Sequence, residues 1–247
     1  MAVLREQPVY VNLRVFRYAT ITGAYAMWSG IESNNSKKSL REGSNMKILN
    51  LYAGIGGNRK LWGDGHEVTA VEFDPDIAKV YQDHFPKDTV VVGDAHQYLL
   101  DHYKEFDFIW SSPPCQTHSS FRHNINVRYR GTPAKFPDMT LYEEIVFLKH
   151  YAPEGLKWVV ENVKPYYGYL IEPSVVLQRH PLWSNFTISN KEFTKDKIRS
   201  AQIPQLSELH GSDLTGVKLS NKRQVLRNCV NPELGLHVLE ELKGGKD

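Results

Sequence analysis

The feature that most constrains the fold is a regular alternation of apolar and polar segments after Met46. Short apolar stretches rich in β-branched and aromatic residues predict four strands, at residues 48–52, 68–71, 89–92 and 106–110. The intervening segments predict helices at residues 58–62, 74–85 and 95–103. Strands that alternate with helices form parallel sheets, and their ligands bind at the carboxyl ends of the strands. We therefore expect an α/β fold with a doubly wound, mainly parallel sheet.

The first three predicted strands each end in groups that suit a nucleotide-type cofactor. Gly54-Ile-Gly-Gly57 follows the first strand, and such a turn lets the backbone approach a ligand closely. Glu72 closes the second strand, at roughly the 20-residue spacing that is typical of a ribose-binding carboxylate. Asp94 closes the third strand, where it is placed to accept a hydrogen bond from an adenine amino group. The pyrophosphate-binding pattern G-x-G-x-x-G is incomplete, which favours S-adenosylmethionine, although a plain turn is the alternative.

Residues 107–120 place a cysteine at the mouth of the fourth strand. Pro113-Pro114 ends this strand, because two prolines supply no ladder donors and force an extended turn. Cys115 follows, in a polar segment that is typical of a loop rather than of a core. A thiol in this place is a candidate nucleophile, and the alternative is a small buried residue that caps a strand.

These motifs resemble, in their order along the chain, those of the C5-cytosine DNA methyltransferases of compact, phage-like or orphan type. The matching segments are Leu49–Gly57, Glu72-Phe73, Gly93-Asp94, the Pro-Cys motif Ser112–Gln116, the Glu-Asn-Val motif Glu161–Val163 and the closing motif Gln224–Pro232. The resemblance implies an S-adenosylmethionine-dependent fold without a metal, in which the closing motif packs beside the first motif. The cofactor contacts that it implies come from Tyr52, Gly54, Gly56, Gly57, Glu72, Phe73, Asp94, Pro113 and Asn228.

The residue after the two prolines indicates that carbon, not nitrogen, accepts the methyl group. Sequences that resemble amino-group methyltransferases carry an aromatic residue there, which stacks on the base, whereas this chain carries Cys115. C5 of cytosine is a weak nucleophile, and a thiolate that adds to C6 turns the ring into a reactive enamine. We expect nearby positive charge or amide dipoles to lower the pKa of Cys115, because the thiolate is the attacking form.

Later residues complete the implied catalytic site. Glu161 closes an apolar strand and is placed to hydrogen-bond or protonate N3 of the base, although a solvated strand end is the alternative. Asn162 is expected to hold the Pro-Cys loop rather than to perform chemistry. Arg179 matches the first arginine of the family's Gln-x-Arg-x-Arg segment, which contacts the base and its phosphate. Pro181 stands where the second arginine belongs, so that role is empty or falls to His180 or another residue.

Basic segments predict contacts with double-stranded DNA. We interpret residues 117–138, which lack clear periodicity, as a mobile loop that closes over a flipped-out base. Residues 140–143 predict a capping box for a helix that runs to about Tyr151. A solvated basic loop and a polar helix start at residues 221–224 are the alternatives to DNA contact. The residues expected to bind DNA are Gln116, Ser119, Arg122, Arg128, Arg130, Lys222 and Arg223.

The chain divides into four predicted regions. We interpret residues 1–45 as a flexible N-terminal extension, with Met46 as the hypothesised natural start. Residues 46–185 form the catalytic domain, residues 186–221 a small basic recognition segment with a turn around 206–216, and residues 222–247 the closing motif with a C-terminal helix. The short recognition segment predicts a short target.

Composition narrows the expected partners and location. The two cysteines give neither a disulfide framework nor a metal-site spacing, which suggests a reducing compartment. The net charge of +2 is too small to settle the partner. The sequence has no apolar run of roughly 18 residues and no export signal. These features predict a cytoplasmic protein. The family resemblance implies a monomer in a bacterial or phage-infected cell, with a cognate restriction endonuclease as a possible partner. The same chemistry on RNA, a non-catalytic DNA-binding relic and a small-molecule methyltransferase are the alternatives.

Overall fold

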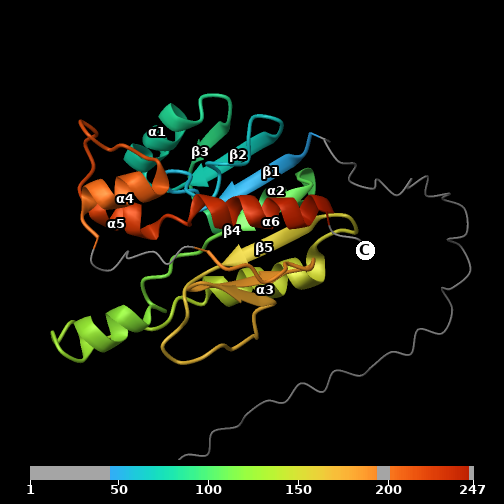
Figure 1. Cartoon of the computed structure of the whole chain (residues 1–247). Helices are drawn as coiled ribbons and strands as arrows, with labels where there is room; N and C mark the ends of the chain where they lie inside the picture. Colours follow the sequence, from blue (N-terminus) through green and yellow to red (C-terminus); the bar gives the residue numbers. More distant parts are fainter. Residues whose placement is uncertain (1–44, 194–200, 245–247) are drawn as a thin grey trace, which may run out of the picture. The chain divides into compact units, whose positions relative to one another are not determined.

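The computed structural model describes residues 45–193 and 201–244, which belong to one compact unit of the chain. They contain a seven-stranded sheet in the order β3-β2-β1-β4-β5-β7-β6 (Figure 1). The strands are β1 (Lys47–Leu51), β2 (Glu67–Glu72), β3 (Thr89–Val92), β4 (Phe108–Ser111), β5 (Lys157–Glu161), β6 (Val175–Leu177) and β7 (His180–Ser184). β1 to β5 pair in parallel, and β7 runs antiparallel to both β5 and β6. The predicted fold class is thus confirmed.

The structure describes two of the predicted regions only in part. The expected N-terminal extension is described only at Asn45, and the expected recognition segment is interrupted at residues 194–200. The C-terminal residues 245–247 also lie outside the described part.

The helices flank this sheet. They are α1 (Pro75–His84), α2 (Ala95–His102), α3 (Thr140–Tyr151), α4 (Ile203–His210), α5 (Lys222–Asn228) and α6 (Pro232–Gly244), with a 3₁₀ segment η1 (Tyr103–Glu105) and a π-helical segment η2 (Arg122–Val127). Asp74 and Asp94 cap α1 and α2 by accepting hydrogen bonds from their first backbone amides, which explains why these two helices begin where the sequence predicts them. None of the helices in the described residues has the length and apolar character needed to cross a membrane.

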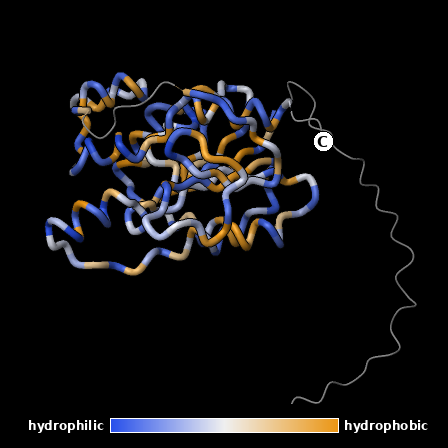
Figure 2. Tube along the Cα trace, turned by 60° about the horizontal axis from the view of Figure 1, so that its bottom comes forward, coloured by the Kyte–Doolittle hydropathy of each residue, from blue (hydrophilic) through white to orange (hydrophobic). Residues whose placement is uncertain are grey.

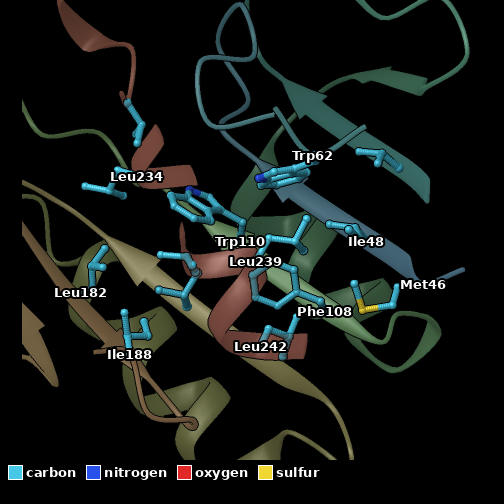
Figure 3. Packing of buried hydrophobic residues seen from close by; sticks show 14 of the residues in the cluster. Met46, Ile48, Trp62, Phe108, Trp110, Leu182, Ile188, Leu234, Leu239 and Leu242 are labelled. Carbon is cyan, nitrogen blue, oxygen red and sulfur yellow. The ribbon is translucent and has the colours of Figure 1, made fainter. Parts of the chain in front are cut away.

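Alternating side chains bury both faces of the sheet. On one face, Ile48 of β1 and Trp110 of β4 pack against Leu239 of α6 (Figure 3). On the other face, Leu49 and Ile109 pack with residues of α2 and α3. Figure 2 shows the hydrophobic residues gathered along the central part of the chain trace. Burial of each large apolar side chain contributes about 1.5–3 kcal/mol, so the period-2 pattern of the strands fixes their register.

The carboxyl ends of the central strands meet at one edge of the sheet. Leu51 of β1 pairs with Ser111 of β4, and Ser111 pairs with Val160 of β5, so the three strands end side by side. β6 and β7 form a hairpin in which Leu177 pairs with His180. Because β7 is antiparallel to β5, this hairpin turn, residues 178–179, lies at the same edge.

The helix predicted at residues 58–62 is wrong, because these residues form successive turns. α6 packs against them. The indole N–H of Trp62 donates to the carbonyl oxygen of Gly235 at 3.1 Å, and a Cβ atom at Gly235 would lie 2.2 Å from the carbonyl oxygen of Asn58. The C-terminal helix therefore covers the face that a helix after β1 would cover. This contact joins residues 173 positions apart, and local sequence carries no signal for it.

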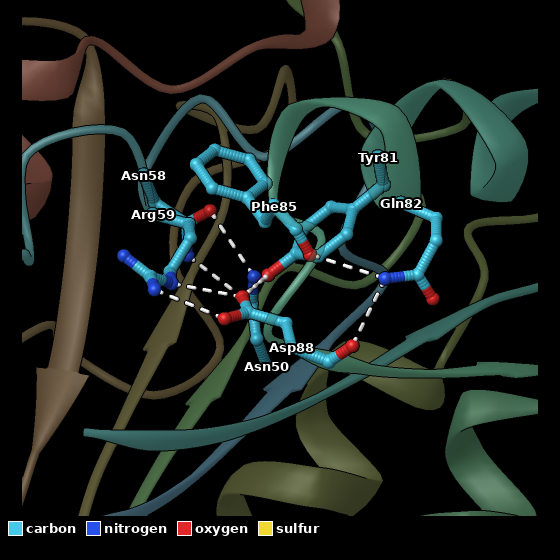
Figure 4. A network of polar contacts seen from close by, with 7 residues as sticks. All are labelled: Asn50, Asn58, Arg59, Tyr81, Gln82, Phe85 and Asp88. Carbon is cyan, nitrogen blue, oxygen red and sulfur yellow. Dashed lines mark hydrogen bonds and ion pairs between the residues drawn. The ribbon is translucent and has the colours of Figure 1, made fainter. Parts of the chain in front are cut away.

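A buried polar network holds the same turn segment in place (Figure 4). Arg59 donates to both carboxylate oxygens of Asp88, at 2.9 and 3.0 Å, and the hydroxyl of Tyr81 donates to Asp88 at 2.8 Å. The side chains of Asn50 and Asn58 exchange hydrogen bonds. The Arg59 and Asp88 side chains are only 4% and 3% exposed, so both charges are desolvated and depend on complete pairing.

Three further expectations of local structure are wrong. α3 ends at Tyr151 as predicted, but no capping box forms at residues 140–143; Met139 holds the N-cap position, and Asp138 accepts from the amide of Thr140. The turn expected around residues 206–216 includes much of α4, because the burial of apolar side chains such as Leu206 stabilises a helix there. The segment 117–138, expected to be irregular, contains η2.

Loss of the Asp88 carboxylate should destabilise the fold strongly. Asp88→Ala leaves the Arg59 guanidinium buried without a counter-charge and the Tyr81 hydroxyl without its acceptor. We expect the free energy of unfolding to fall by about 3–5 kcal/mol, measured by urea denaturation followed by circular dichroism. Lys87→Ala is the matched control, because it removes an exposed ion pair. The side chains of Lys87 and Asp64 in this pair are 73% and 68% exposed. The control variant should leave the urea midpoint almost unchanged, and equal shifts in the two variants would contradict the importance of the buried network.

Candidate active site

One cavity of about 1240 Å³ opens at the carboxyl edge of the sheet. Its walls come from the loops after β1 and β2, the segment after β4, the end of β5 with the β6–β7 hairpin, and the residues around α5. Gly54, Gly57, Cys115 and Glu161 all line this cavity. The glycine-rich loop, the thiol and the carboxylate singled out in the sequence therefore share one space.

The glycine-rich loop after β1 needs glycine for two different reasons. Gly54 has a φ of 55°, a left-handed conformation, and its amide donates to the Glu72 carboxylate at 2.9 Å. Gly57 allows a close approach, because a Cβ atom there would lie 2.6 Å from the carbonyl oxygen of Val230. Gly56 faces α1 and does not line the cavity. The contact of Gly57 places the closing motif beside the first motif, as the family resemblance implies.

Tyr52, at the start of the same loop, contacts a polar cluster on the face of the sheet that α2 and α3 cover. Its hydroxyl donates to Glu144 of α3 at 2.6 Å. Glu144 is fully buried, accepts a hydrogen bond from Ser111 of β4 and lies 3.1 Å from Nδ1 of His96. Burial, followed by the charge of Glu144, raises the pKa of Tyr52, so its hydroxyl remains a hydrogen-bond donor. No sequence pattern singles out Glu144, which ties β1, β4, α2 and α3 together beneath the cavity.

The residues after β2 form a second wall. The Glu72 carboxylate accepts from the amides of Gly54 and Asp74, at 2.9 and 3.0 Å, and each oxygen keeps a second lone pair for a ligand. Phe73, which is 77% exposed as a residue, also lines the cavity. Asp94, in contrast, is exposed, caps α2 and does not line the cavity.

Asn162 holds the Pro-Cys loop, as predicted. Its Nδ2 donates to the carbonyl oxygen of Pro113 at 2.9 Å, and its Oδ1 accepts from the amide of Val163 at 2.9 Å. The side chain is buried, so both bonds are shielded from water. The loops after β4 and β5 are thereby fixed to each other, and with them Cys115 and Glu161.

The pKa of Cys115 differs from the sequence-based expectation. Burial and then the negative charge of Glu161 raise the pKa of this thiol to about 11, and the positive charge of Arg179 opposes them only in part. The prediction of a lowered pKa is therefore wrong for the protein without substrate. Cys115 is therefore protonated at neutral pH in the protein without substrate.

Glu161 forms a buried pair with His180. Nδ1 of His180 lies 2.5 Å from Oε1 of Glu161, and the side chains are 3% and 8% exposed. Burial alone would raise the pKa of Glu161, but the charge and hydrogen bond of His180, a hydrogen bond from Ser112 and the charge of Arg179 together lower it. Glu161 is consequently an ionised carboxylate at neutral pH, held by neighbours from two loops.

The residues predicted to bind DNA are divided between the cavity and its surroundings. Three of them line the cavity: Gln116, Ser119 and Arg122. Arg128 and Arg130 lie exposed after η2. Lys222 and Arg223 begin α5 outside the cavity lining, and Arg223 donates to the carbonyl oxygen of Ala201 at 3.1 Å.

The β6–β7 hairpin contributes two cavity residues that the sequence identified poorly. Gln178, which the sequence analysis did not select, lines the cavity with a φ of 55°. Tight hairpin turns of this conformation usually carry Gly, Asn or Asp, so the sequence held no turn signal. The sequence left the place of the missing arginine empty or filled by His180 or another residue, and the structure places His180 beside Glu161.

Comparison with known proteins bears on both the family and the fold. A family model of the C-5 cytosine-specific DNA methylases matches residues 46–167. The solved structure of the Dnmt2 methyltransferase of S. pombe is similar with a TM-score of 0.50 and 12% identity, over 81% of this chain and 98% of that chain. That likeness shows a methyltransferase fold.

Other solved structures match shorter parts. A DNMT2 mutant of Spodoptera frugiperda is 26% identical, with a TM-score of 0.33, over 49% of this chain and 36% of that chain. A hypothetical protein of Thermus thermophilus is 17% identical, with a TM-score of 0.40, over 57% of this chain and 74% of that chain. No curated protein matches the chain significantly.

The charges around Cys115 predict opposite effects of two substitutions on its reactivity. Glu161→Gln removes a negative charge and should lower the pKa of Cys115, whereas Arg179→Gln removes a positive charge and should raise it. At a fixed mildly alkaline pH, each unit of pKa should change the alkylation rate by roughly threefold, because part of the tenfold gain in thiolate is offset by lower nucleophilicity. Iodoacetamide labelling with peptide mass spectrometry measures the rate. Unchanged rates in both variants would show that these charges do not act on the thiol.

Proposed function

Because the chain belongs to the C-5 cytosine-specific DNA methylase family, we propose that it transfers a methyl group from S-adenosylmethionine to C5 of cytosine in double-stranded DNA. In this proposal the base is flipped out of the duplex and forms a covalent adduct between its C6 and the sulfur of Cys115. One observation carries it: Cys115, Glu161 and the glycine-rich loop after β1 line a single cavity.

The residues of the cavity fit the proposed methyl donor. The Glu72 carboxylate keeps free lone pairs beside the backbone of Gly54, which suits a ribose diol, and the exposed ring of Phe73 offers an apolar surface to an adenine. Pro113 and Asn228 line the same space. When bound, S-adenosylmethionine supplies an electrophilic methyl group. A volume of about 1240 Å³ exceeds the roughly 300–1,000 Å³ of common ligand sites, so it has room for a nucleotide base as well.

The roles of Cys115 and Glu161 follow from their mutual charge effect. The ionised carboxylate raises the pKa of the thiol, so the protein without substrate keeps Cys115 protonated. A cytosine that shares a proton between its N3 and Glu161 would neutralise the carboxylate and remove this effect. Thiolate formation would thus be linked to correct placement of the base. The protonated N3 also draws electrons from the ring and makes C6 more electrophilic.

Double-stranded DNA is the polymer that we propose as substrate. Arg122 lines the cavity with Cys115, and Arg128 and Arg130 lie exposed further along the same segment, so we expect phosphates of a bound strand to pass along it. RNA presents the same base and phosphates, so transfer to RNA is the alternative that the experiment must separate. A non-catalytic DNA-binding protein is the second alternative, and it requires that Cys115 have no chemical role.

The decisive experiment measures transfer of a tritiated methyl group from S-adenosylmethionine to double-stranded DNA and to RNA of mixed sequence. We expect incorporation into DNA, located at cytosines by bisulfite sequencing. Cys115→Ser should reduce it by roughly three orders of magnitude or more, because a serine hydroxyl is not ionised here, while binding of S-adenosylmethionine is retained. Methylation of RNA alone would move the proposed activity to RNA. Binding of DNA without transfer to either polymer would favour the non-catalytic alternative.

The covalent step has its own test. DNA that carries 5-fluorocytosine cannot lose a proton from C5, so the sulfur cannot be released after methyl transfer. We expect a denaturation-resistant complex of protein and DNA with the wild-type chain. The Cys115→Ser variant should not form it. A wild-type enzyme that methylates DNA yet leaves no such complex would contradict the covalent adduct.

A further inference from the structure

Glu161 has a neighbour that the family's arginine pattern does not contain. In the β5–β7 ladder Glu161 pairs with Leu182, and His180 lies two residues earlier on the same strand. The side chains of Glu161 and His180 therefore project from the same face of the sheet as diagonal neighbours. With Nδ1 and Oε1 only 2.5 Å apart, a proton must lie between them whenever the carboxylate is ionised.

The second ring nitrogen of His180 is in an unusual position. Nε2 is buried and has no hydrogen-bond partner among the described residues, and the same is true of Nε of Arg179. Leaving such groups unpaired costs free energy, so a position that serves only the scaffold would normally satisfy them. Both residues line the cavity. The hairpin thus presents two unsatisfied nitrogens where the substrate would bind.

The charges around the pair come from four parts of the chain. Glu161 on β5 interacts with Arg179 of the hairpin and with Ser112 and Cys115 of the segment after β4. Arg227 and Cys229 of the closing motif interact with Arg179 in turn. Among these groups Glu161 is the single acid, surrounded by a histidine and arginines. The positive charges stabilise the ionised form of Glu161, so the proton of the pair stays on His180.

We propose that His180 is a positioning residue that stores the proton which Glu161 delivers to N3 of the target cytosine. This inference rests on the proposed function. In the imidazolium form, Nδ1–H donates to Oε1 and fixes the orientation of the carboxylate. The thiol of Cys115 gives its proton to solvent water and its sulfur forms a bond to C6, while the C5=C6 electron pair moves to C4–C5 and the C4=N3 pair moves onto N3. Glu161 takes the Nδ1 proton of His180 and passes it to N3, so the carboxylate is ionised again once N3 is protonated.

The proton returns at the end of the cycle. The C4–C5 electron pair would form the bond from C5 to the methyl group, the donor sulfur would keep the pair of its broken bond to that methyl, and the N3 lone pair would re-form C4=N3. The C5 hydrogen then leaves to solvent water, its electron pair forms C5=C6, and the C6–S pair leaves with the sulfur, which takes a proton from solvent water. N3 gives its proton back to Glu161, and the histidine is recharged. An arginine could orient the carboxylate but could not store this proton, because a guanidinium does not ionise in proteins. An imidazole ring can give up a proton and take it back, so His180 can play a part that an arginine could not.

Two substitutions separate proton storage from simple orientation or charge. His180→Asn keeps a hydrogen-bond donor near Nδ1, and His180→Arg restores a cation, but neither can carry the proton. We expect both to lower the single-turnover rate of methyl transfer by roughly 10²-fold, with the KM for S-adenosylmethionine unchanged. His102→Asn is the matched control, because His102 lies 2.8 Å from Glu105 in a similar but exposed pair.

A measurement without substrate keeps the inference testable if a variant is unstable. In wild-type protein with isotope-labelled histidine, nuclear magnetic resonance should show a strongly deshielded Nδ1 proton for His180, and Glu161→Gln should remove it. A His180 signal that is insensitive to Glu161→Gln would overturn the inference. So would a wild-type rate in either His180 variant, while the proposed function would survive that result. Failure of the wild-type protein to methylate any cytosine polymer would overturn both.

Discussion

The parallel register of β1, β4 and β5 is the constraint on which the site depends. Leu51, Ser111 and Val160 are paired across these strands, so the loops that follow them start at the same height. A slip of one residue would turn every side chain of a strand to the other face and carry Glu161 away from the cavity. The hydrogen bond from Asn162 to Pro113 then joins two of these loops directly. Burial of apolar side chains on both faces thus decides where the reactive groups meet.

The electrostatics around Cys115 depend on the neighbouring acid Glu161. Glu161 stays ionised despite its burial because His180 and Arg179 stabilise its negative charge. Burial and the negative charge of Glu161 in turn keep Cys115 protonated. A site with a permanent thiolate would be exposed to oxidation and alkylation whether or not substrate were present. In the proposed mechanism the resting thiol is unreactive, and the thiolate forms at the step in which a base neutralises Glu161. Reactivity and substrate binding would then be coupled through a single carboxylate.

The sequence predicted those features that depend on local patterns. β3 and α3 occupy the residues expected of them, and Asn162 has the structural role assigned to it. What could not be predicted depends on contacts between distant residues. The turns at residues 58–62 are packed against α6. The pKa of Cys115 reflects burial and the negative charge of Glu161 on another strand. The partner of Glu161 was likewise hidden, because nineteen residues and a hairpin turn without the usual turn residues separate it from His180.

The docking of α6 also explains why the two ends of the domain act as one unit. Gly57 lies against Val230, and Gly235 lies against Asn58, so backbone meets backbone with no room for a side chain at either place. Such close approach makes the shape of the glycine-rich loop depend on the position of the closing motif. Leu206 and Leu214, which precede α5, pack in the same cluster as Ile55 of the glycine-rich loop. The described residues of this part of the chain are therefore positioned by packing against that loop.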